Sequence, residues 1–63
     1  MKRKPGDTVT AYYDPQGEQT PEGQVTLIRL VQELADRDIW EVEFTDEPGE
    51  IYRLQLRKQR KLR

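Results

Sequence analysis

The chain has 63 residues, so it holds one domain at most, and a domain of this size buries only about 60% of the surface that its unfolded chain exposes. Cysteine, histidine, serine and asparagine are all absent, which excludes disulfides, Ser-His and Cys-His nucleophile pairs and the Cys/His ligand sets of zinc. We therefore expect no enzyme, no cofactor and no metal ion.

The start of the chain is basic but leads into polar residues rather than an apolar stretch, so it does not read as a signal peptide. No apolar run is long enough to span a bilayer. We expect a soluble, cytoplasmic protein that does not enter a membrane.

Charge is nearly balanced overall, at −1, but it is segregated along the chain. Residues 1–4 carry three positive charges, residues 53–63 carry six, and neither segment contains an acid. Residues 5–52 hold all 12 acids against only Arg29 and Arg37. Such segregation indicates that the two ends share a partner or a role that the middle does not.

In chain order, residues 8–13 alternate β-branched and aromatic side chains after a Gly-Asp turn and predict a first strand. Residues 14–23 hold two prolines and two glycines and predict a loop. Residues 39–44 alternate cleanly, with the apolar side chains inward, and residues 52–57 alternate after a Pro-Gly turn within 45–50. These segments predict strands joined by turns.

Residues 25–34 are ambiguous. Their apolar positions 27, 30, 31 and 34 have helical spacing, but Gly23 would lie in the first turn, β-branched residues follow and no convincing cap is near. A polar connection of four residues, 35–38, joins this stretch to the next strand, as in a hairpin. We favour a strand with a bulge near Ile28 or Leu30, because both of its faces carry apolar residues. The alternative is an α+β fold with a helix at about 25–35.

Four or five short antiparallel strands predict an all-β fold, a small closed barrel that removes exposed sheet edges. We expect residues 1–5 to form a basic N-terminal arm, residues 6–57 the single small β-barrel, and residues 58–63 a basic C-terminal tail.

Several short motifs cover most of residues 6–57. They are Gly6-Asp7-x-Val9-x-Ala11-x-Tyr13, Gly23-Gln24-Val25, Glu41-Val42-Glu43-Phe44-x-Asp46, Pro48-Gly49, and Leu54 or Leu56. In order and spacing they resemble the small Src-homology-3-like barrels of the Tudor, Agenet and KOW modules. The resemblance implies a five-stranded antiparallel barrel. It also places Tyr13 and Phe44 at two positions of the aromatic cage with which Tudor modules hold methylated cations, so these two form a candidate aromatic ligand pocket. The alternative is that both belong to the core.

Glu50, Ile51 and Tyr52 resemble the end of the Val-Gln-Ile-Tyr run of plasmid-borne type II dihydrofolate reductases. Those are small barrels assembled as tetramers around a central pore that this run lines. The resemblance implies a homo-oligomer and, as the least favoured function, folate reduction. Glu50 stands where that family has glutamine, and an acid there would repel an anionic cofactor.

In a barrel of this type the first and last strands are neighbours, so both basic ends would form one cationic surface that attracts phosphates. The candidate nucleic-acid-binding residues are Lys2, Arg3, Lys4, Tyr12, Arg53, Arg57, Lys58, Arg60 and Lys61. Tyr12 is included because its ring is expected to point outward from the first strand and to stack on an unpaired base. We therefore expect a non-catalytic module that binds RNA, DNA or ribonucleoprotein.

Two alternatives stay open. In the first, the basic ends are solvated tails, and the module binds a protein partner or forms a homo-oligomer and has no nucleic-acid role. In the second, the basic end of one chain docks on the acidic residues 33–50 of another.

Overall fold

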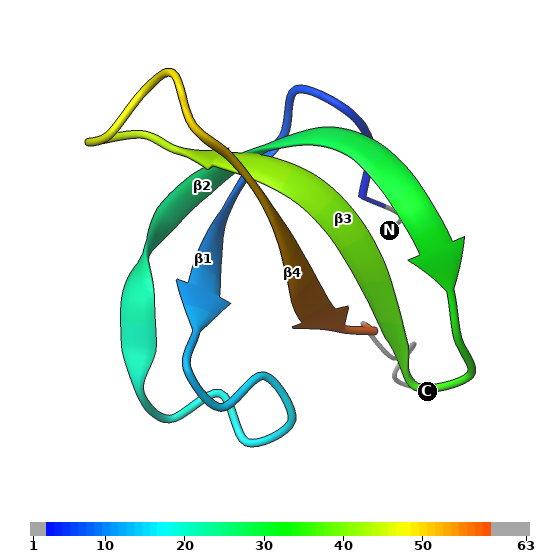
Figure 1. The fold of residues 1–63 in the computed structure, drawn as a ribbon. Helices are drawn as coiled ribbons and strands as arrows, with labels where there is room; N and C mark the ends of the chain where they lie inside the picture. The colour runs from blue at the N-terminus through cyan, green and yellow to red at the C-terminus, as the bar shows by residue number, and fades with distance from the viewer. Residues whose placement is uncertain (1–2, 59–63) are drawn as a thin grey trace.

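The structure, a computed structural model, describes residues 3–58. Its four strands are β1 (Thr8–Tyr12), β2 (Pro21–Glu33), β3 (Arg37–Phe44) and β4 (Ile51–Arg57). They form one antiparallel sheet in the order β1-β2-β3-β4 (Figure 1). The described residues include no helix, and so none that could cross a membrane. The all-β prediction is confirmed, and the alternative helix at 25–35 is wrong, because residues 25–33 belong to β2 and residues 34–35 to the connection that follows it.

The sheet is strongly curled. Figure 1 shows β2 and β3 bending along their length, and this curl brings β1 and β4 towards each other. The two are not hydrogen-bonded neighbours, however, so the described chain has four strands in an open sheet where the sequence predicts a closed five-stranded barrel. Beside the end of β4, Arg3 Nη1 donates to the Arg57 carbonyl at 2.8 Å and Glu18 pairs with Arg57 at 3.8 Å.

Strand β2 carries two bulges. Its register against β3 shifts between Leu27 and Arg29 and again between Leu30 and Gln32, which confirms the bulge predicted near Ile28 or Leu30. Each shift adds one residue to β2 that has no counterpart on β3. Leu27 therefore lies opposite Val42 and Leu30 lies opposite Trp40. The bulges let this long strand bend around the core.

The core lies inside the curl. Its buried members are Ala11, Val25, Leu27, Trp40, Val42 and Leu56, with Val9, Phe44 and Leu54 packed against them. Trp40 and Val42 are on the inner face that the alternation of residues 39–44 predicts. On the outer face, Glu41 lies between two arginines, with Arg29 Nε at 3.0 Å and Arg53 Nε at 3.7 Å. This row ties β2, β3 and β4 together, although exposed pairs of this kind stabilise only modestly.

The loop between β1 and β2 is organised by Asp14. Its carboxylate accepts the backbone N–H groups of Gln19 at 3.0 Å and Thr20 at 2.8 Å. The loop is shorter than residues 14–23, because β2 already begins at Pro21. The bond from Thr20 is the main reason that the pKa of Asp14 lies below its ordinary value, an effect that loss of hydration partly opposes.

Asp14→Ala is expected to destabilise the fold at neutral pH, since two backbone donors lose their acceptor. Because the folded-state pKa is lowered, the contribution of Asp14 is present above 3.8, its ordinary value, and is lost as pH falls through the folded-state pKa. Urea unfolding at a series of pH values checks this: the difference between wild type and variant should shrink in acid. A difference that is constant with pH would contradict the role given to the carboxylate.

Candidate functional site

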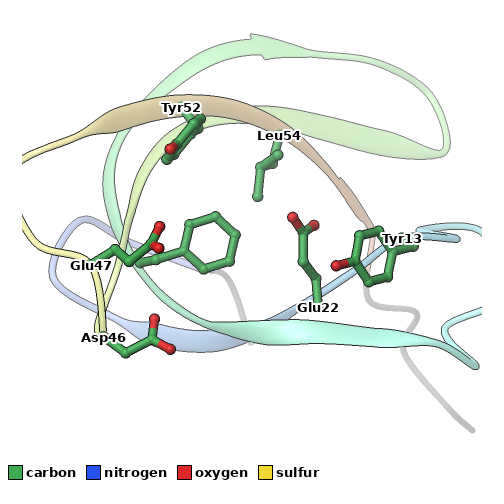
Figure 2. A pocket seen from close by; sticks show the side chains of 7 residues that line it. Tyr13, Glu22, Asp46, Glu47, Tyr52 and Leu54 are labelled. Carbon is green, nitrogen blue, oxygen red and sulfur yellow. The ribbon is translucent and has the colours of Figure 1, made fainter.

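A hollow of about 320 Å³ lies between the first loop, the β3–β4 turn and β4. Its lining, which we call the acidic pocket, consists of Tyr13, Glu22, Phe44, Asp46, Glu47, Tyr52 and Leu54. Figure 2 shows Glu22 and Glu47 on opposite sides of the pocket, with Tyr52 and Leu54 along β4. Four separate segments therefore contribute to one site.

Two aromatic rings form a corner in the acidic pocket. The ring centroids of Phe44 and Tyr52 are 5.6 Å apart and the planes meet at 81°. Gly23 leaves one side of Phe44 without a covering side chain, since an added Cβ would lie 3.4 Å from the ring. The third ring, Tyr13, is 69% exposed and lies at the rim. Ring faces carry partial negative charge, so a corner of this kind favours a cation.

The carboxylates of the acidic pocket lack basic partners. Within the described residues, no ion pair or side-chain hydrogen bond involves Glu22, Asp46 or Glu47. The neighbouring Glu50 accepts a bond from the Tyr52 hydroxyl at 3.0 Å. Six other acids do pair with lysine or arginine: Asp7, Glu18, Glu33, Asp36, Asp38 and Glu41. The uncompensated negative charge of the described chain is therefore concentrated at this pocket.

The pKa of Tyr52 reports this negative field. The hydrogen bond to Glu50, then the charge of Glu50, raises the pKa of the Tyr52 hydroxyl above 10.0. Loss of hydration and the charges of Glu47 and Glu22 act in the same direction. Each of these negative charges disfavours the ionisation of the Tyr52 hydroxyl and favours a positive charge nearby.

The two residues of the predicted aromatic pocket, Tyr13 and Phe44, both line the acidic pocket. Sequence reasoning missed Tyr52 and Glu22 as members of the site. The alternation of residues 52–57 does place Tyr52 on the inner face, but only the curl of the sheet brings it against Phe44. Glu22 lies at the start of β2, where the sequence predicts loop.

Most of the predicted nucleic-acid-binding residues that the structure describes are paired with acids. Lys4 contacts Asp7 at 3.7 Å, and Lys58 contacts Glu33 at 3.1 Å. Arg53 and Arg57 pair with Glu41 and Glu18, as described above. Lys2, Arg60 and Lys61 lie outside the described residues.

A second hollow, of about 430 Å³, adjoins the acidic pocket and contains Tyr12. It is lined by Tyr12, Tyr13, Pro15, Glu22, Arg53, Leu54 and Gln55. Three of these residues, Tyr13, Glu22 and Leu54, also line the acidic pocket. The two hollows therefore lie side by side along β4, and we call the pair the β4 channel.

The described residues contain no group of three or more His, Cys, Asp or Glu side chains arranged to hold a metal ion. The segment that resembles a reductase pore, from Glu50 to Tyr52, enters β4 with Ile51 54% exposed. Comparison of the chain with family models, with curated proteins and with solved structures gives no match.

Proposed function

We propose that this protein is a non-catalytic interaction module that holds a cationic side chain of a protein partner in the acidic pocket. The observation that carries this proposal is the meeting of two rings at 81° with three carboxylates, Glu22, Asp46 and Glu47, that lack a basic partner in the described chain. Rings and carboxylates attract the same kind of ligand, a cation partly stripped of water.

The curled antiparallel sheet supports the resemblance to Tudor, Agenet and KOW modules, and we place the chain among them as an open, four-stranded version of the Src-homology-3-like barrel. Tudor modules hold methylated side chains in an aromatic cage. In this chain Tyr52 supplies a ring beside Phe44, and Tyr13 supplies one at the rim. The acids add charge to that corner.

The cost of losing bound water ranks the candidate cations by expected affinity. A simple ammonium group is strongly hydrated and loses much on entering a pocket, whereas a guanidinium or an alkylated ammonium is hydrated more weakly. We therefore expect arginine or alkylated lysine to bind more tightly than unmodified lysine. A few contacts of about 1 kcal/mol each give a single side chain a Kd of about 1 mM.

Titration of the protein with the amino-acid amides of lysine, trimethyllysine, arginine and dimethylarginine, followed by amide NMR shifts, tests the proposal. The expected shifts cluster at Gly23, Phe44, Glu47 and Tyr52, with lysine the weakest ligand. Tyr52→Leu should weaken binding about tenfold, and Tyr12→Leu, which changes a ring outside the acidic pocket, should not. Shifts confined to other parts of the chain, or no shifts at all, would exclude this function.

The raised pKa of Tyr52 gives an independent prediction. Glu50→Gln should lower that pKa towards 10.0, since its hydrogen bond and charge are the leading causes of the shift, and a bound cation should lower it too. A raised pKa means that the contribution of Tyr52 to stability is complete below 10.0 and is lost as pH rises through the folded-state value. Ultraviolet titration of tyrosinate, with Tyr52→Phe to assign the signal, measures it. Asp36→Asn is the control, and an equal effect there would refute the assignment.

Binding of nucleic acid or ribonucleoprotein through the basic ends is a second candidate, favoured by one contact. The bond from Arg3 Nη1 to the Arg57 carbonyl brings the N-terminal arm beside the strand that leads into the basic tail. A combined basic surface attracts phosphates. A phosphate would have to compete there with Glu18 for Arg57 and with Glu33 for Lys58.

Fluorescence anisotropy with labelled single-stranded RNA and duplex DNA separates the two candidates. The full chain is compared with one ending at Lys58, which keeps every described ion pair. Nucleic-acid binding through the ends requires affinity that truncation abolishes and salt weakens steeply. The absence of binding by the full chain at low salt would remove this candidate.

A further inference from the structure

The outer edge of β4 is open for backbone pairing. β4 is the last strand of the sheet order, and among the described strands its only hydrogen-bonded neighbour is β3. Within the described residues, no turn, loop or side-chain bond reaches the backbone of residues 51–56, and the first backbone contact on that side is at Arg57. An exposed strand edge is a template on which another chain can add a strand.

The β4 channel runs beside this edge. One end, at Asp46 and Glu47, is acidic and aromatic, and the other end, at Pro15 and Gln55, carries no acid. Leu54 lies in both hollows, so the channel follows β4 over about four residues. Further along the strand, Arg3 and Glu18 contact Arg57.

From this juxtaposition we infer that the ligand is an extended segment of a partner polypeptide that pairs with the edge of β4 between Tyr52 and Gln55 and places one cationic side chain in the acidic pocket. This inference rests on the proposed function. Backbone bonds supply affinity and the pocket supplies specificity, as in other cases of strand addition. The added segment would be a fifth strand beside the four that the described residues form.

Charge complementarity argues for a cationic segment rather than a second copy of β4. The two bases of β4, Arg53 and Arg57, already contact Glu41 at 3.7 Å and Glu18 at 3.8 Å. A second copy paired edge to edge would also bring two sets of Glu22 and Glu47 closer together. A segment with one lysine or arginine derivative satisfies both the edge and the pocket.

The test compares acetyl-trimethyllysine-methylamide with a peptide of about seven residues that carries trimethyllysine at its centre between threonine and valine residues and is otherwise uncharged. The peptide is expected to bind at least about tenfold more tightly, because several backbone bonds add to the single side chain. Amide hydrogen exchange of residues 51–55 should slow when the peptide binds.

Backbone N-methylation provides the matched control. In an extended segment, alternate N–H groups point to opposite edges. Methylating the set that faces β4 should return the peptide to the affinity of the single residue, while methylating the other set should have little effect.

The outcomes are distinguishable. If the single residue binds but the peptide binds no more tightly, or if neither methylated set loses affinity, strand addition is wrong and the pocket function stands. If neither ligand binds, both proposals fall. If sedimentation shows the protein alone forming a dimer that Gln55→Pro disrupts, a second copy occupies the edge and the inference is overturned.

Discussion

Replacing Leu27 with alanine is expected to lower the free energy of unfolding by about 3 kcal/mol. Leu27 is 1% exposed, at the centre of the core cluster and opposite Val42. A domain of this size has a total stability of about 5 kcal/mol, so the variant should keep only about 2 kcal/mol and unfold at a much lower urea concentration. Urea unfolding followed by the fluorescence of Trp40, which is buried, measures the change.

Leu30→Ala is the matched control for this prediction. The residue type and the strand are the same, but Leu30 lies beyond the first bulge and is 42% exposed. Its replacement should cost about 1 kcal/mol or less. Equal losses at the two positions would contradict the difference in burial between Leu27 and Leu30.

Glu47→Lys should abolish most of the cation binding, weakening it at least about tenfold. The substitution replaces a negative charge at the edge of the acidic pocket with a positive one, and each change opposes the ligand. Glu47 is exposed and its only described hydrogen bond runs from its own backbone N–H to the Phe44 carbonyl, so the fold should be unaffected. Calorimetry or NMR titration with trimethyllysine amide gives the ratio of Kd values.

Asp36→Lys controls for the overall change of charge. It lies in the connection between β2 and β3, away from the acidic pocket, and changes the net charge by the same amount. Binding should stay within about twofold of wild type, since distant exposed charges are screened. A similar loss in both variants would mean that the ligand responds to net charge and not to this site.

The alternation of residues 39–44 was sufficient to predict β3, because every second side chain does face the core. Strand β2 was harder, and its bulges explain why. Leu27 and Leu30 lie opposite Val42 and Trp40, and Glu33 lies opposite Asp38, so the β2 residues paired with alternate residues of β3 recur every three positions instead of every two. Two inserted residues thus give a strand the apolar spacing of a helix.

The acidic pocket was only partly predictable. The resemblance named Tyr13 and Phe44, but Glu22 and Tyr52 are 30 positions apart in the chain and meet only because the sheet curls. The segregation of charge along the chain was visible in the sequence, but the sequence did not show which of these charges form ion pairs. Ion pairs with Glu41 and Glu18 neutralise Arg53 and Arg57, whereas the pocket acids Glu22, Asp46 and Glu47 have no basic partner in the described chain.

The most direct test of the acidic pocket replaces the charge of its ligand without changing the ligand's shape. Trimethyllysine amide and its uncharged isostere, in which carbon replaces the quaternary nitrogen, are titrated against the protein by NMR. Cation binding by Phe44, Tyr52 and the surrounding carboxylates predicts that the charged ligand binds at least about tenfold more tightly, with shifts at these residues. Equal affinity for the two ligands would show that the pocket is merely apolar and would contradict the proposed function.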